Sequence, residues 1–210
     1  MAAKKPDYPK MEFADAKAFD RWLGKEHARA TGVWVVFAKK SSGITSVDYK
    51  GALEVALTWG WIDGQAGRVD DERWMQKYTP RGPRSIWSKI NRERIAALEA
   101  AGRMKPAGRA AVEAAKADGR WDAAYDSPST ATVPDELVKA LAKNARAKKM
   151  FATLDSINRY AILHRVQTAK KPETRAKRIA TFVEMLARGE TLHPPRAPKP
   201  KAKKTPKRAK

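Results

Sequence analysis

Tryptophan is concentrated in one stretch of the chain, residues 56–91, and this limits what the chain can fold into. The stretch holds four of the seven tryptophans, namely Trp59, Trp61, Trp74 and Trp87. Rings of this size bury large apolar areas, so the stretch must lie close to a core. Tryptophan rings beside polar groups also line concave ligand sites. The pattern therefore predicts a core, a binding site, or both at this place.

Residues 79–85, with the sequence TPRGPRS, form a proline-stiffened basic turn. The two prolines fix φ and push each preceding residue toward an extended conformation. In polyproline II geometry three residues make one turn, so Arg81 and Arg84 would point the same way. A helix capped by Ser85 or Ser88 would follow, and its first amides are free donors at the positive end of the helix dipole. This arrangement favours a bound anion. The alternative is that both arginines are solvated or pair with nearby acids.

The sequence Gly-Trp-Ile-Asp-Gly places Asp63 between two glycines shortly before this turn. Asn91 falls on the apolar face of the helix that follows, so it needs hydrogen-bond partners from the turn or from a ligand. Arginine forks suit carboxylate or phosphate groups, and indole rings suit a planar group. We therefore predict a Trp/Arg cleft for a small anionic or nucleotide-like ligand, lined by Trp61, Asp63, Arg81, Arg84, Ser85, Trp87, Ser88 and Asn91.

Asp63 also supports a second hypothesis, that the protein is a small enzyme. A carboxyl group buried among tryptophans is suited to general acid–base catalysis because desolvation makes it hold its proton. However, no second carboxylate, serine–histidine pair, phosphate-binding loop or metal cluster stands beside it in the sequence. The spacing of Gly60 and Gly64 by itself indicates turn geometry. Asp63 is thus a weak catalytic candidate, and we expect a binding protein.

The N-terminal half alternates helical and strand patterns. Asp15 can begin a first helix and Ser46 a second, while a β-branched and aromatic run at residues 33–37 has the length of a strand. A hairpin is predicted from residues 65–69 and 73–78 around an acidic tip. Alternation along its second strand places on one face Trp74, Gln76 and Tyr78.

Helical periodicity dominates the C-terminal half. Helices are predicted over residues 107–118, 134–143, 145–153, 156–170 and 173–188. The sequence therefore predicts an α+β protein with a small, mostly antiparallel sheet and helices in the N-terminal half and a helical C-terminal half. We expect an α+β domain at residues 13–119, a helical region at residues 120–189 and a disordered basic tail at residues 190–210. Whether the first two share one core is left open.

The net charge of +21 is uneven, because residues 196–210 contain six lysines, two arginines and no acid. Such a tail can bind nucleic acid phosphates without sequence specificity. The residues that we expect to make these contacts are Lys199, Lys201, Lys203, Lys204, Lys207 and Arg208. The alternative is a tail that only increases solubility.

Several classes of protein are disfavoured by composition. The chain has no cysteine and three histidines, so we expect no disulfide, no metal site and no cofactor. The longest apolar run, residues 33–38, is far shorter than the roughly 20 residues that span a bilayer. The first ten residues lack the apolar region of a secretory signal. We therefore expect a cytoplasmic protein.

Several blocks of the chain resemble the YdeI/OmpD-associated family, also described as bacteriocin-protection proteins. They are GWIDG at residues 60–64, TPR at 79–81, SIWSKIN at 85–91, GRM at 102–104, GRWD at 119–122 and KPETRAKRI at 171–179. The resemblance extends from Phe13 to Gly189. It implies protection against bacteriocins or cationic antimicrobial peptides and association with an outer-membrane porin, and it implies no catalytic residues. A chain of this charge would repel a cationic peptide, so direct sequestration is not expected.

Overall fold

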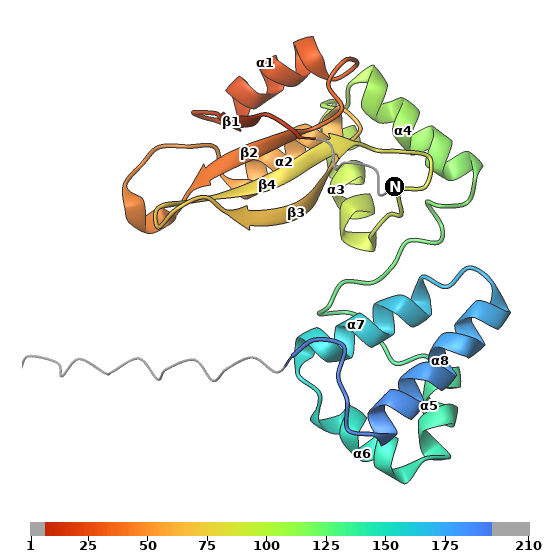
Figure 1. The fold of residues 1–210 in the computed structure, drawn as a ribbon. Helices are drawn as coiled ribbons and strands as arrows, with labels where there is room; N and C mark the ends of the chain where they lie inside the picture. Colours follow the sequence, from red (N-terminus) through yellow and green to blue (C-terminus); the bar gives the residue numbers. More distant parts are fainter. Residues whose placement is uncertain (1–6, 195–210) are drawn as a thin grey trace, which may run out of the picture. The chain divides into compact units, whose positions relative to one another are not determined.

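The computed structural model describes residues 7–194 and forms two compact units that divide between Tyr125 and Asp126 (Figure 1). Each unit has its own cluster of buried apolar side chains. The expected boundary after residue 119 lies inside the first unit. None of the described helices is long and apolar enough to cross a membrane.

The first unit contains a four-stranded mixed sheet in the order β1-β2-β4-β3. Its strands are β1 (Lys10–Glu12), β2 (Val33–Ala38), β3 (Trp61–Arg68) and β4 (Arg73–Pro80). The β1–β2 pair is parallel and the other two pairs are antiparallel, which confirms a mostly antiparallel sheet in an α+β fold. The expectation of turn geometry from Gly60 to Gly64 was wrong. Of these two glycines only Gly60 has a positive φ. Gly64 lies within β3, because cross-strand pairing with β4 starts at Trp61.

Four helices and one short 3-10 turn complete this unit: α1 (Ala16–Glu26), η1 (Lys40–Ser42), α2 (Tyr49–Thr58), α3 (Lys89–Ala100) and α4 (Pro106–Ala117). Asp15 caps α1 as predicted. The prediction that Ser46 caps α2 was wrong. The cap is Asp48, because the Ser46 hydroxyl instead accepts a hydrogen bond from the Ala38 amide on β2.

One face of the sheet forms the core of this unit. Val33, Val35 and Phe37 on β2 stand opposite the predicted face of β4, formed by Tyr78, Gln76 and Trp74. Helix α1 packs on this face, where the rings of Phe19 and Tyr78 have their centroids 5.6 Å apart. Alternation therefore places rings on the buried side. It also places Gln76 there, which must find hydrogen-bond partners within the core.

Close packing of α4 on α2 depends on Gly108. A Cβ atom at this position would overlap the carbonyl group of Thr58. The missing side chain therefore lets the two helices approach, and the small alanine-rich face of α4 has the same effect.

The second unit is helical, with α5 (Asp135–Ala142), α6 (Ala145–Thr153), α7 (Ser156–Gln167) and α8 (Pro172–Ala187). Its core includes Leu137, Ile162 and Leu186. Residues 190–194, which were expected to begin the disordered tail, are instead held against α7 by hydrogen bonds to Asn158. The amide of buried Asn158 donates a hydrogen bond to the His193 carbonyl (3.2 Å) and accepts one from the His193 amide (2.9 Å). A buried amide needs such partners, and this fixes the segment.

Candidate functional site

The predicted basic turn is fixed to the body of the first unit by backbone and side-chain contacts. The Arg81 amide donates to the Gly60 carbonyl at 2.9 Å, and the Ser85 hydroxyl accepts from the Gly82 amide at 3.1 Å. Arg120, 8% exposed, donates through Nη1 to the Ser85 carbonyl at 3.1 Å. The conformation of the turn therefore depends on a residue that follows it by 35 positions.

The guanidinium of Arg81 lies over the ring of Trp87, with Cζ 3.5 Å from the ring centroid. Its Nη1 donates to the Ile86 carbonyl at 3.2 Å. Its Nε and Nη2 atoms are buried and have no hydrogen-bond partner in the described part of the chain. Burial lowers the pKa of Arg81 to about 10 because desolvation disfavours the charged form. Nε and Nη2 form one edge of the guanidinium, the edge that binds a carboxylate with two parallel hydrogen bonds.

The two predicted ring residues are both core residues. Trp87 is 1% exposed, its indole Nε1 has no partner, and its ring meets Trp121 edge-on at 4.9 Å. Trp61 is also 1% exposed and meets Trp22 edge-on at 5.9 Å. Because Trp61 pairs with Pro80 across the hairpin, it lies next to the start of the turn. The structure thus brings Trp61, Arg81 and Trp87 into one region.

Asp63 lies on β3 directly across from Tyr78. Its Oδ2 accepts hydrogen bonds from the Tyr49 hydroxyl at 2.7 Å and from Gln76 Nε2 at 3.5 Å. Gln76 Nε2 also donates to the Gly64 carbonyl at 2.6 Å. Burial, followed by the hydrogen bond to Asp63, raises the pKa of Tyr49. The carboxylate is therefore held by a tyrosine and an amide.

Two further tyrosines complete the surroundings of Asp63 and Arg81. Tyr78 is fully buried, and its hydroxyl has no hydrogen-bond partner among the residues that the structure describes. Burial, and secondly the charge of Asp63, raises its pKa. Burial also raises the pKa of Tyr125, against the charge of Arg81. We call Tyr49, Tyr78 and Tyr125 the site tyrosines.

The charges of Asp63 and Arg81 act on each other without a direct ion pair. The Asp63 carboxylate raises the pKa of Arg81, against the larger effect of burial. Yet the only side-chain donors to Asp63 in the described part of the chain are Tyr49 and Gln76. Arg81 in turn donates to a backbone carbonyl. The opposite charges of Asp63 and Arg81 are thus held near one another, and the guanidinium keeps N–H groups that can donate to a ligand.

The other predicted site residues have different surroundings. Arg84 is exposed and Arg81 is partly buried, so the two arginines have different surroundings. Ser88 caps α3 by accepting from the Asn91 amide at 3.2 Å. Asn91, 8% exposed, accepts from Arg94 Nη1 at 2.9 Å. Ser88 and Asn91 therefore organise the start of α3.

Sequence reasoning missed Tyr49, Tyr125 and Arg120, which come from α2 and from the segment after α4. Gln76 and Tyr78 were placed on one face of β4 but were not assigned to the site. The sequence held only weak signals for these residues. Gln76 is a polar residue on the buried face of a predicted strand, and Arg120 lies in the block at residues 119–122.

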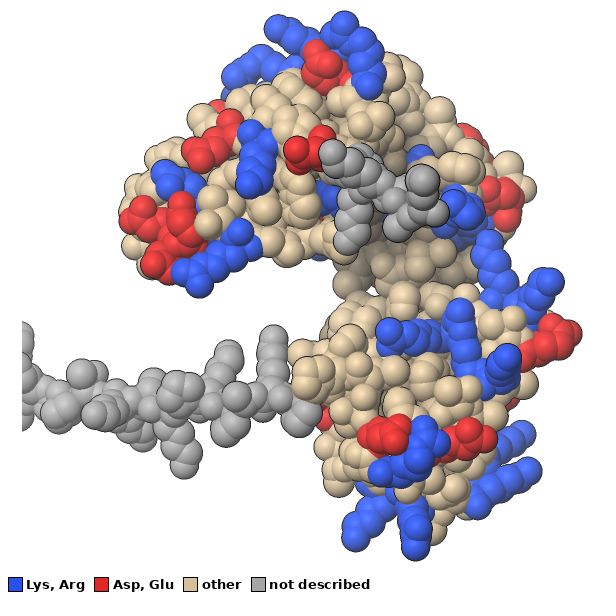
Figure 2. Space-filling view, viewed as in Figure 1, with Lys and Arg blue, Asp and Glu red and all other residues tan. Residues whose placement is uncertain are grey.

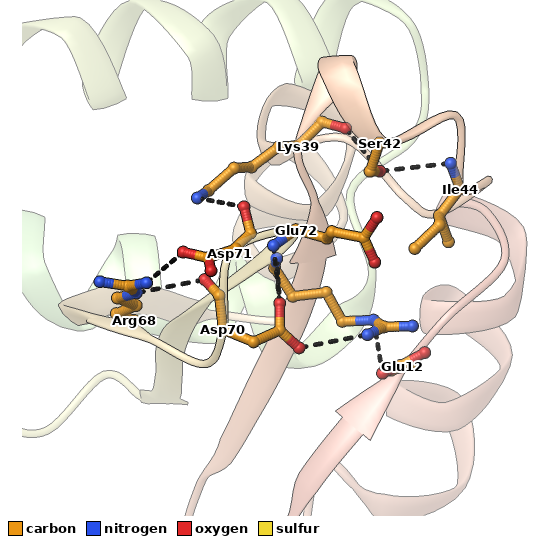
Figure 3. A network of polar contacts seen from close by, with 9 residues as sticks. Glu12, Lys39, Ser42, Ile44, Arg68, Asp70, Asp71 and Glu72 are labelled. Carbon is orange, nitrogen blue, oxygen red and sulfur yellow. Dashed lines mark hydrogen bonds and ion pairs between the residues drawn. The ribbon is translucent and has the colours of Figure 1, made fainter.

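The acidic tip of the β3–β4 hairpin forms a separate polar network (Figure 3). Asp70 accepts from the amides of Glu72 (2.8 Å) and Arg73 (2.6 Å). These backbone hydrogen bonds contribute to a lowered pKa of Asp70. Arg68 pairs with Asp71, and Arg73 lies between Asp70 and a glutamate of β1. These acids are used to close the hairpin and do not converge on an open position.

Four surface hollows of 390 to 590 Å³ are lined by other residues than the eight predicted ones. Across residues 7–194, no group of three or more His, Cys, Asp or Glu could hold a metal ion. Lysine and arginine side chains are visible on both units with acidic side chains among them (Figure 2). The tail residues predicted to contact nucleic acid, Lys199, Lys201, Lys203, Lys204, Lys207 and Arg208, lie outside the described residues, so that hypothesis stays a prediction.

Comparisons with known proteins divide the chain in two. Residues 130–189 match the family model described as bacteriocin-protection, YdeI or OmpD-associated. Residues 11–111 match a domain of unknown function, DUF8412. No curated protein and no solved structure matches the chain. The resemblance seen in the sequence is therefore confirmed for the second unit, while most of its quoted blocks fall in the separately described N-terminal domain.

Proposed function

We propose that this chain, which carries a domain of the bacteriocin-protection, YdeI or OmpD-associated family at residues 130–189, has a ligand-binding module in its N-terminal unit. The ligand is a small planar molecule with a carboxylate or phosphate group. The acid group binds the free edge of Arg81, next to Trp87 and the site tyrosines.

The observation that carries this proposal is a set of buried donors without acceptors. Nε and Nη2 of Arg81, Nε1 of Trp87 and the hydroxyl of Tyr78 all lack a hydrogen-bond partner among residues 7–194. Each unsatisfied buried polar group costs about 1–3 kcal/mol, and native proteins contain few of them. All four can donate, so an oxygen-rich group is the partner that would satisfy them. A carboxylate or phosphate also compensates the charge of Arg81.

The family description supplies the physiological context of the proposal. It names bacteriocin protection and association with OmpD. We propose that ligand binding by the first unit serves the same context, with the second unit providing the family-specific part.

The proposal is tested by titrating the full chain with benzoate, inorganic phosphate and adenosine monophosphate. The indole N–H signals of the seven tryptophans are followed by ¹⁵N nuclear magnetic resonance, with Trp87→Phe used to assign Trp87. We expect at least one of these anions to shift the Trp87 signal. Arg81→Met should weaken its binding at least tenfold, because hydrogen bonds to charged groups contribute about 1.5–3 kcal/mol.

The matched control is Arg84→Met, which removes the same charge from the same turn at an exposed position. We expect it to change the affinity less than threefold. Equal losses in the two variants would show that only net charge matters. The absence of any shift at Trp87 with all three anions would refute the proposed site.

A further inference from the structure

The arrangement of Asp63 relative to Arg81 restricts the kind of molecule that the proposed site can hold. Both residues project from the same end of the β3–β4 hairpin. Asp63 pairs with Tyr78, and two positions along the ladder Trp61 pairs with Pro80, the residue before Arg81. Asp63 and the start of the basic turn therefore lie at the same end of the hairpin, which places an acceptor and a donor edge there.

The Asp63 carboxylate retains capacity for a further hydrogen bond. Both of its side-chain donors, Tyr49 and Gln76, use Oδ2. An ionised carboxylate accepts through both of its oxygens, at up to about four lone-pair positions. The residue is only partly buried, so Oδ1 can accept from a bound molecule. The site thus offers an acceptor near Asp63 and unpaired donors at Arg81, Trp87 and Tyr78.

Arg81 and Asp63 do not form an ion pair with each other. An arginine and an aspartate whose charges interact would gain from a direct pair, but Arg81 donates to the Ile86 carbonyl and Asp63 accepts from uncharged groups. The surrounding contacts hold both side chains in place. Arg81 is stacked on Trp87, and Asp63 is fixed by the 2.7 Å bond from Tyr49.

We propose that the site takes an amino-substituted planar acid, whose acid group binds Arg81 and whose N–H group donates to Asp63. This inference rests on the proposed function and narrows it from any planar anion to one with a donor at its far end. A ligand with a hydrogen-bond acceptor at that end would be repelled by the Asp63 carboxylate, which is itself an acceptor. Such a ligand would bind less well.

The test compares ligands that differ only at the far end. Benzoate, 4-aminobenzoate and 4-methoxybenzoate are titrated into the full chain, and dissociation constants are taken from the Trp87 indole signal. We expect 4-aminobenzoate to bind about tenfold more tightly than benzoate and 4-methoxybenzoate to bind no better than benzoate. This comparison uses the unaltered protein, so it does not depend on whether a variant folds.

Asp63→Asn then tests whether Asp63 is the acceptor for the amino group of the ligand. We expect it to bring 4-aminobenzoate to within threefold of benzoate while benzoate itself still binds. Asp71→Asn, at the exposed hairpin tip, is the matched control and should leave the tenfold difference intact.

The outcomes separate the two proposals. If all three acids bind equally and depend on Arg81, the proposed function stands and the role of Asp63 is refuted. The same conclusion follows if Asp71→Asn reduces the difference as much as Asp63→Asn. If benzoate, phosphate and adenosine monophosphate all fail to bind, the proposed function fails and the further inference fails with it. If 4-aminobenzoate binds about tenfold more tightly than benzoate and Asp63→Asn removes this difference, both proposals stand.

Discussion

Replacing Tyr78 by phenylalanine removes a buried hydroxyl group that has no hydrogen-bond partner within residues 7–194. Tyrosine-to-phenylalanine changes in a core usually destabilise a protein because a hydrogen bond is lost, but here no bond is lost. Removing an unsatisfied buried group recovers its desolvation cost, about 1 kcal/mol at the lower end of the usual range. The oxygen leaves a void of roughly 10 Å³, which costs about 0.2 kcal/mol at 24 cal/mol per Å³. We therefore expect Tyr78→Phe to raise the free energy of unfolding by about 1 kcal/mol.

Tyr49→Phe is the matched comparison, because this hydroxyl donates to Asp63 at 2.7 Å. Tyr49 is 38% exposed, so water can replace part of the lost bond. We expect the free energy of unfolding to fall by about 1 kcal/mol. The two variants make the same chemical change in the same region and should shift stability in opposite directions.

Urea unfolding followed by tryptophan fluorescence measures this difference. All seven tryptophans lie between residues 22 and 121, within the first unit, so the signal reports on that unit alone. The m-value should stay constant if the unfolding remains two-state. If Tyr78→Phe destabilises the unit as much as Tyr49→Phe, the Tyr78 hydroxyl has a partner. Tyr78 is then not one of the unpaired donors of the proposed site.

Two further predictions concern the same unit. Above pH 10 its free energy of unfolding should fall. The raised pKa values of the site tyrosines give a stability that is complete below pH 10 and lost as the pH rises. The pKa of Arg81, lowered to about 10, acts in the opposite sense but is one group against three. Urea unfolding between pH 8 and 11 measures this, and Tyr78→Phe should lose less stability than the unaltered protein. Gly108→Ala should lower the free energy of unfolding by about 1–3 kcal/mol through overpacking. Gly82→Ala, with no atom within 4 Å of the added methyl group, should change it by less than about 0.5 kcal/mol in the same assay.

Helix-capping preferences and strand alternation were sufficient to predict local structure where only one residue could fill a given position. Asp15 begins α1 and Ser88 begins α3 because each side chain reaches an amide three positions ahead. Alternation placed Trp74, Gln76 and Tyr78 on one face. The same rules failed at Ser46, where a second cap-forming residue, Asp48, lies two positions later. Only the position of β2 decides that the Ser46 hydroxyl is used elsewhere.

The candidate site shows the same division. The sequence placed Arg81 and Trp87 in one short segment, and their stacking follows from that proximity. It could not show that Arg120 fixes the turn or that Tyr49 holds Asp63. These pairs are separated by many positions and meet only after the helices pack on the sheet. It also could not show that Trp61 is buried in the core.

The sequence by itself determined the class of fold, the order of most helices and strands, and the family of the second unit, because periodicity, capping residues and short motifs act over a few positions. The tertiary structure alone decided which polar groups are left without partners. Whether the Tyr78 hydroxyl or the free edge of Arg81 finds an acceptor depends on atoms contributed by several distant segments. The sequence pattern does not show which buried donors find an acceptor, because burial and hydrogen bonding depend on how the whole chain packs.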